Sequence, residues 1–398
     1  MSSGLILVLL VASAFVAAHF AFERLGKRFL IVSGAEYLAL GILLGPQVSG
    51  IFTPALLDSL AAFPALALGW MGAIIGMRLY LPELIKISGF TYRIALAESL
   101  LTVAVVFALE AFAFMWLFDI SLLLATPPAL ALAAIGVSSS RETYEIVSRH
   151  LGEGRFVTQL DVSTTINNFV AVFTFGCLLA AFHANPTGAV RPLTATEWVV
   201  LTAGIGLIGG ALFHLFLGAE ENIDRLFVAL AGALILVSGA AAYLGLSPLL
   251  AALFFGFMLV NTSRNRIEIA AALTRVERPL YFVLLIFAGA TWQPSLRAWV
   301  APVVLFVFAR AAAKIGASRL SARMEGALPT LGPSWGLAML GQGGVAVALG
   351  IDYLQQDHFA FTHVVFTAVV ASVLLTDMSS ARLARNVFAS IPEPEDAR

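Results

Sequence analysis

Apolar runs of about 20 residues recur along the whole chain, and this pattern limits its possible folds more than any other feature. Hydrophobic residues make up 60% of the 398 residues and charged residues only 12%, about half the charged share of a soluble domain. Lipid offers the backbone no hydrogen bonds, so such runs must form helices or a closed barrel. The runs do not alternate apolar and polar residues, which argues against a barrel. We therefore predict an all-α polytopic membrane protein.

Thirteen segments are long and apolar enough to be membrane spans, and we number them in chain order. They are predicted to form a single transmembrane domain over residues 1–390, followed by a short inner tail over 391–398. The predicted bounds are 4–22, 29–45, 58–77, 93–117, 121–147, 157–182, 197–217, 222–240, 243–260, 279–293, 298–318, 332–350 and 359–380.

The basic residues orient these predicted spans. If the N-terminus lies outside, 19 of the 23 Lys and Arg residues fall on the inner side of the membrane. Arg191 and Arg297 fall outside, and Arg310 and Lys314 lie within the eleventh span. Inner loops of membrane proteins carry such an excess of Lys and Arg. The distribution therefore predicts an outer N-terminus and an inner C-terminus.

Polar residues and glycines interrupt several spans at one depth. Ser138 and Ser139 lie in the fifth span, and Asn167 and Asn168 lie in the sixth. The twelfth span contains Gly341, Gln342, Gly343 and Gly344. Ser138 lies ten residues after Pro128, where the fifth span is expected to enter the membrane, and the other two sets lie about ten residues into their spans. Ten residues are about 15 Å along a helix, which is the middle of the bilayer core. Polar groups at this depth usually mark a functional site, although each break alone also fits close helix packing.

Spans four to six and spans eleven to thirteen run in opposite directions, and each triplet has its break in the middle helix. This pattern predicts inverted repeats with two broken helices that cross, as in many secondary transporters. We expect residues 93–182 and 298–380 to form a transport core. Residues 1–77 and 197–293 are expected to form a scaffold that carries the dimer contacts.

The order of several motifs resembles the monovalent cation/proton antiporter superfamily, which has the sodium/hydrogen exchanger fold. The resemblance covers nearly the whole chain. The matching segments are 36–46, which ends in Gly45-Pro46, then 133–155, 158–171, 246–256, 278–289 and 341–344. The resemblance implies a homodimeric transporter that exchanges a monovalent cation (Na⁺, K⁺ or Li⁺) for protons.

The chain departs from the family pattern at the ion-binding position. The resemblance implies Asp-Asp or Asn-Asp where this sequence has Asn167 and Asn168. An amide oxygen can contact a cation, but an amide does not titrate and cannot carry the exchanged proton. Asp161 and Glu142 are candidates to carry the proton instead. Each also fits a simple ion pair with a neighbouring arginine.

The other candidate residues are expected to surround the two amides. The predicted ligands of the ion are the side chains of Asn167, Asn168, Ser138, Ser139 and Thr165. Arg310 or Lys314 is the predicted counter-charge, since the resemblance implies a basic residue here that pairs with the ion-binding acid. Glu98 and Glu110 of the fourth span are expected to face protein or lipid headgroups.

Three functions stay open on the sequence. The leading one is cation/proton exchange in the plasma membrane, the inner membrane of a bacterium. The second is transport of an anion or an uncharged solute on the same fold, which two amides and the retained basic residues would suit. The third is a membrane scaffold or sensor without transport. We expect no enzyme, metal or cofactor, and the net charge of −1 gives no reason to expect a nucleic-acid partner.

Overall fold

The computed structural model describes residues 35–60, 62–152, 154–183, 192–217, 220, 222–293, 300–332, 334–356 and 359–388. Over these residues the chain is helical, and no β-strand occurs among them. The first predicted span, 4–22, lies outside the described residues. Helices coincide with each of the other twelve predicted spans. The predicted all-α class is therefore confirmed for the described part of the chain.

The helices keep the order that the apolar runs predict. They are α2 (Ala35–Leu44), α3 (Pro54–Ser59), α4 (Ala62–Met77), α5 (Leu81–Leu84), α6 (Gly89–Phe118), α7 (Leu122–Val137), α8 (Arg141–Leu151), α9 (Arg155–Ala181), α10 (Ala195–Leu217), α11 (Ile223–Tyr243), α12 (Pro248–Thr262), α13 (Arg266–Thr291), α14 (Val300–Met324), α15 (Leu328–Leu331), the 3₁₀ helix η1 (Trp335–Met339), α16 (Gly343–Leu354) and α17 (Thr362–Phe388). Two predicted spans are divided: α7 and α8 share the fifth, and η1 and α16 share the twelfth.

Five of the described helices are long and apolar enough to cross a membrane by length and composition. They are α6, α9, α10, α11 from Asp224 onward, and α14. Helices α4, α7, α12 and α16 are apolar but shorter. Helices α7 and α16 are short because each is one half of a broken span.

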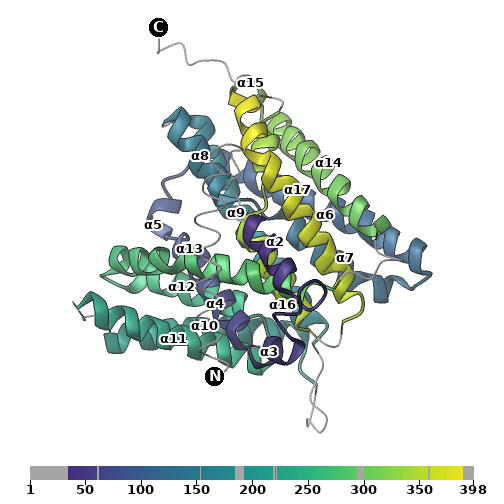
Figure 1. The fold of residues 1–398 in the computed structure, drawn as a ribbon. Helices are drawn as coiled ribbons and strands as arrows, with labels where there is room; N and C mark the ends of the chain where they lie inside the picture. Colours follow the sequence, from purple (N-terminus) through teal and green to yellow (C-terminus); the bar gives the residue numbers. More distant parts are fainter. Residues whose placement is uncertain are drawn as a thin grey trace.

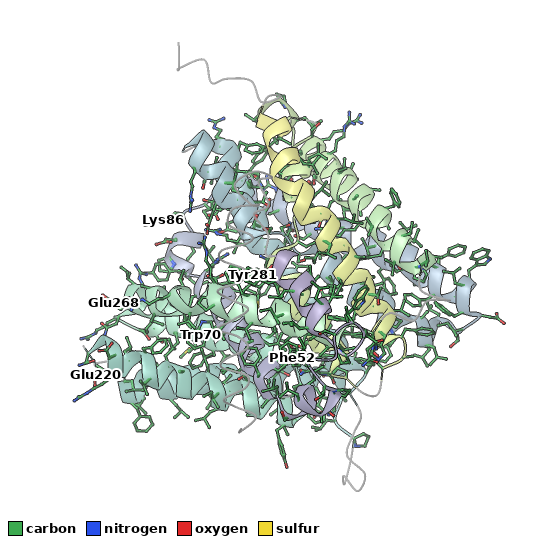
Figure 2. The ribbon with its side chains drawn as sticks, viewed as in Figure 1. Phe52, Trp70, Lys86, Glu220, Glu268 and Tyr281 are labelled. Atoms are coloured by element: carbon green, nitrogen blue, oxygen red, sulfur yellow. The ribbon has the colours of Figure 1, made fainter. Side chains whose placement is uncertain are left out.

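Helix α13 begins earlier than the hydropathy predicts. The predicted span starts at residue 279, whereas α13 starts at Arg266. The added turns are rich in Arg and Glu, which are good helix formers but lower the hydropathy. Figure 2 shows Glu268, near the start of α13, on the same side of the molecule as Lys86 and Glu220. All three residues belong to segments that the sequence predicts on the inner side.

The helices pack in two groups (Figure 1). Helices α4 and α10–α13 form the first group, the α12 group, in which α12 packs against α4, α10 and α11. Trp70 of α4 lies inside this group (Figure 2), and its indole N–H donates to the carbonyl of Leu273 at 3.0 Å. Helices α6–α9 and α14–α17 form the second group, the α6 group, in which α6 packs against α7, α9 and α14. The two groups meet where α16 packs against α4 and α13.

Helices α4 and α12 approach so closely that their backbones touch at glycines. A Cβ atom added at Gly72 would lie 2.2 Å from the carbonyl oxygen of Leu249. At Gly76 it would lie 2.0 Å from the carbonyl oxygen of Leu253. Small residues spaced three or four apart allow membrane helices this kind of contact. The α4–α12 contact therefore leaves no room for a side chain at these positions.

The substitution Gly76→Ala is expected to destabilise the protein by about 1–3 kcal/mol, because the added methyl group would push α12 away from α4. Gly316→Ala on α14 is the matched control, since nothing lies within 4 Å of a Cβ atom there. Thermal unfolding of both variants in detergent checks the prediction. A melting temperature of Gly76→Ala equal to that of the wild type would contradict the described contact.

Candidate functional site

The fifth span is broken at three serines. Helix α7 ends at Val137, residues 138–140 are non-helical, and α8 begins at Arg141. The hydroxyl of Ser140 accepts a hydrogen bond from the backbone N–H of Thr143 at 3.4 Å and so caps α8. Serine favours this position because its hydroxyl satisfies an N–H group that has no partner within the helix. The predicted break in this span is confirmed.

The twelfth span is broken in the same way, and the two breaks touch. Helix η1 ends at Met339, residues 340–342 are non-helical, and α16 begins at Gly343. The φ angle of Gly343 is +63°, a conformation that favours glycine. The N–H of Ser140 donates to the carbonyl of Gly341 at 2.7 Å. The two broken helices therefore cross at these residues.

Arg310 of α14 binds the exposed backbone of both breaks. Its Nε donates to the carbonyl of Gly136 at 3.1 Å, and its Nη2 donates to that of Ser138 at 3.2 Å. Its Nη1 donates to the carbonyl of Leu340 at 2.7 Å, and the whole side chain is buried. Carbonyls at a helix end lack partners within the helix and carry partial negative charge. These contacts give Arg310 a structural role, and the predicted counter-charge is then Lys314.

Asn168 of α9 also supports the first break. Its Oδ1 accepts from the backbone N–H of Ser139 at 3.0 Å, and its Nδ2 donates to the carbonyl of the same residue at 3.1 Å. An amide can make this pair of bonds because it carries one acceptor and one donor group. An ionised aspartate could accept from the N–H but could not donate to the carbonyl. The amide therefore fits a backbone-holding role better than the predicted role of an ion ligand.

Ser139 connects Asn167 to a buried ion pair. The Nδ2 of Asn167 donates to the Oγ of Ser139 at 3.0 Å, and the Nζ of Lys314 donates to the same oxygen at 3.2 Å. The Oδ1 of Asn167 accepts a short hydrogen bond from Ser99 of α6. Lys314 in turn forms an ion pair with Glu98, with 3.1 Å between Nζ and Oε1. Helices α6, α9 and α14 thus converge on the break through polar side chains.

Glu98 is the carboxylate of this cluster. It and Lys314 are both fully buried. The hydroxyl of Thr102 also donates to Oε1 of Glu98, at 3.2 Å. The other oxygen, Oε2, is buried and has no hydrogen-bond partner within the described structure. Glu98 therefore neutralises Lys314 and keeps one oxygen able to accept a further ligand.

Sequence reasoning places Glu98 against protein but misses its pairing with Lys314. The signal that could have found it is the carboxylate itself, which lies in an apolar span where ionisable groups are costly and usually functional. Neighbouring Ser99 and Thr102 strengthen that signal. Glu110, further along α6, is also fully buried.

Asp161 lies apart from this pair. Its carboxylate forms an ion pair with Arg141, and the two side chains are 41% and 28% exposed. The guanidinium of Arg141 also lies over the ring of Tyr144, 4.2 Å from its centre. The described contacts thus pair Asp161 with Arg141 rather than with Lys314 or Arg310. The side chain of Glu142, the other predicted proton carrier, lies outside the described residues.

The remaining predicted site residues are buried or half-buried at the two breaks and on α9. Ser138 is buried, and its hydroxyl donates to the carbonyl of Ile135 at 2.7 Å. Thr165 is half-buried on α9, one turn before Asn168. Gln342 is buried in the second break, and Gly343 and Gly344 are the first residues of α16.

A cavity of about 300 Å³ leads to the two breaks. Ser139, Asn168 and Gln342 line one end of it, which we call the floor. Tyr281 of α13 lines its wall and lies where the two helix groups meet (Figure 2). Ser139 contacts both the cavity and Lys314. One residue therefore separates the cavity from the buried ion pair.

The substitution Asp161→Asn is expected to change the free energy of unfolding by less than about 1 kcal/mol, because partly exposed ion pairs contribute little. Thermal unfolding of the variant in detergent measures this change. A loss of several kcal/mol would contradict the weak contribution expected of a partly exposed pair.

The fold of the chain is that of a solved sodium proton antiporter. A structure of MjNhaP1 from Methanocaldococcus jannaschii at pH 8 has a TM-score of 0.70 and 14% sequence identity, covering 97% of this chain and 99% of the antiporter chain. A structure from an electron-microscopy map of the same antiporter has a TM-score of 0.67 and 15% identity, covering 98% and 99%. Neither a protein-family profile nor a curated protein sequence matches the chain significantly. The shared fold and the five apolar helices make the chain a multi-pass membrane protein.

Proposed function

We propose that the chain is a secondary transporter that exchanges a monovalent cation for protons by alternating access. The fold shared with a sodium proton antiporter supports this proposal, as do the two broken helices that cross. The observation that carries it is the buried ion pair of Glu98 and Lys314, which reaches the broken helix through Ser139. Lys314 of this pair supplies the proton-carrying group that the two amides lack.

In the proposed exchange step, one positive charge replaces another beside Glu98. In the described state the ammonium of Lys314 pairs with the carboxylate at 3.1 Å. When a cation arrives, Lys314 releases its proton to water and stays as a neutral amine beside the cation-bound carboxylate. The buried net charge is equal in both states, which avoids an unpaired charge in the membrane interior. Arg310 cannot take this role, because a guanidinium keeps its proton.

Oxygen atoms around Glu98 form the proposed cation site. Alkali cations in membrane proteins are held by oxygen ligands that replace their hydration shell. Oε2 of Glu98 accepts no hydrogen bond from the described residues, and Thr102 and Ser139 place hydroxyl oxygens near the ion pair. The side-chain carbonyl of Asn167, which accepts a hydrogen bond from Ser99, is a further ligand of the cation in this proposal. Asn168 instead holds the break in shape, so only one of the two amides contacts the ion.

The proposed orientation follows the distribution of basic residues. The N-terminus lies outside and the C-terminus inside the plasma membrane of a bacterium. Residues 93–182 and 298–380 form the moving core, and residues 1–77 and 197–293 form the scaffold and dimer contact. The two packed groups of helices support this division (Figure 1). The substrates are protons and one of Na⁺, K⁺ or Li⁺.

Proteoliposomes that contain a pH-sensitive dye test the proposed exchange. An outside pulse of Na⁺, K⁺ or Li⁺ is expected to raise the internal pH as protons leave in exchange for the cation. A pulse of a large organic cation and protein-free liposomes are the controls, and both should leave the pH unchanged. Correctly reconstituted protein that gives no response to any of the three cations would overturn the proposal.

A second candidate is transport of an anion or an uncharged solute on the same fold. The observation that favours it is the neutral cavity floor, where Ser139, Asn168 and Gln342 present hydroxyl and amide groups. The same liposomes separate the candidates: no response to cations together with flux along an anion gradient supports the second. A protein that responds to no gradient would instead be a scaffold or sensor.

A further inference from the structure

Arginines dominate the charged side chains that line the cavity. Four of them come from three helical segments: Arg78 follows α4, Arg141 begins α8, and Arg275 and Arg278 lie on α13. The acidic side chains that line the cavity are Glu145 and Glu277. These charged residues belong to segments that the sequence predicts on the inner side. The described part of the lining therefore has an excess of positive charge.

Nearby acids do not remove this excess. Arg141 pairs with Asp161, which lies beside the cavity, and Glu145 lies 3.7 Å from Arg149. Among the described side chains, and with Asp161 included, the arginines still outnumber the carboxylates. Arg275 and Arg278 are exposed on the cavity side of α13. Their guanidinium groups can therefore reach a ligand within the cavity.

The backbone adds positive potential beside the floor of the cavity. Helices α8 and α16, with 11 and 12 residues, both begin at the cavity: Ser140 and Arg141 line it at one start, and Gly343 and Gly344 at the other. The N-terminus of a helix carries about half a positive charge. Both second halves of the broken helices thus direct their positive ends toward the cavity. Arginine side chains and the positive ends of helices both bind oxyanions in proteins.

We propose that this cavity is a binding site for an oxyanion, a carboxylate or phosphate group carried by a small solute or by a lipid headgroup. A volume of about 300 Å³ lies at the lower end of small-molecule sites. An anion bound there contacts the arginines and covers the floor at Ser139 and Asn168. Its occupancy blocks the route to the ion pair and inhibits exchange. Binding itself does not depend on the proposed exchange activity.

Binding of inorganic phosphate to the purified full chain in detergent tests the proposal. Phosphate is expected to raise the melting temperature of the wild type in a saturable manner, because a ligand of the folded state stabilises it. The variant Arg275→Gln/Arg278→Gln should bind phosphate at least about tenfold more weakly, since charge-assisted hydrogen bonds to the anion are lost. The control variant Arg319→Gln/Arg323→Gln removes two exposed arginines of α14 outside the cavity, and it should bind like the wild type.

Competition between phosphate and an anionic lipid distinguishes the two sources of the oxyanion. If phosphatidylglycerol in mixed micelles displaces phosphate from the wild type, the natural ligand is a lipid headgroup. If it does not, the ligand is a soluble anion. Equal phosphate binding by the wild type and the cavity variant would overturn the proposal. So would equal weakening in the two double variants, or no saturable binding to the wild type. These outcomes leave the liposome test of cation exchange unaffected, because binding is measured without transport.

Discussion

Replacing Glu98 by glutamine is expected to abolish cation/proton exchange and to lower the free energy of unfolding by about 3–5 kcal/mol. Glutamine keeps the size of the side chain but removes the negative charge that lies 3.1 Å from Nζ of Lys314. A fully buried ammonium would then have lost its counter-ion. A cation that enters the site would also meet no negative charge. Thermal unfolding in detergent and the internal-pH assay measure the two effects.

The double variant Glu98→Gln/Lys314→Met separates transport from folding. It removes both charges at once, and methionine fills much of the space of lysine. Replacing a whole buried ion pair by uncharged side chains is often neutral for stability. We therefore expect the double variant to regain most of the stability that Glu98→Gln loses, while exchange stays absent. A Glu98→Gln protein with wild-type stability and exchange would contradict the proposed role of the pair, as would exchange by the double variant.

Replacing Arg310 by lysine is the second change with a large expected effect. The guanidinium donates to three carbonyls, those of Gly136, Ser138 and Leu340. A lysine keeps the charge but cannot span both breaks with a planar set of donors. We expect a loss of about 3 kcal/mol in the free energy of unfolding, because hydrogen bonds from a charged donor contribute about 1.5–3 kcal/mol each. Thermal unfolding of the variant in detergent measures this loss.

The control for this change is Arg319→Lys on the same helix, at an exposed position. It should leave the melting temperature within experimental error of the wild type. We also expect Arg310→Lys to slow exchange, because the two breaks are then held less firmly. If Arg310→Lys matched Arg319→Lys in both stability and exchange, Arg310 would not be the residue that joins the breaks.

The sequence predicts the helices and both breaks because membrane burial acts on whole segments. Apolar runs of bilayer length must form helices in lipid, and twelve of the thirteen predicted spans fall on described helices. The breaks are visible because Ser138 to Ser140 and Gly341 to Gly344 interrupt apolar runs. Helix α13 begins outside its predicted span because hydropathy detects apolar burial, whereas its first turns are charged but helical.

The partners within the site could not be predicted, because they depend on how each helix is rotated. Glu98 faces Lys314 rather than lipid headgroups only because α6 packs against α14 with that face inward. Asn168 binds the backbone of Ser139, a contact that sequence spacing across two helices does not reveal. Asp161 pairs with Arg141, a contact between two helices that the sequence does not specify. The sequence thus predicts which segments form helices, but it does not predict how each helix is rotated or which side chains pair between helices.

Proton release on cation binding tests the central claim most directly. Purified protein in weakly buffered detergent solution with a pH dye is mixed with NaCl, KCl or LiCl, and the proton signal is compared with that of Glu98→Gln/Lys314→Met. We predict that the wild type releases protons in a saturable response to at least one of the three cations and that the double variant releases none. Cation binding by the wild type without proton release, or an equal release by the double variant, would contradict the assignment of Glu98 and Lys314 as the exchange site.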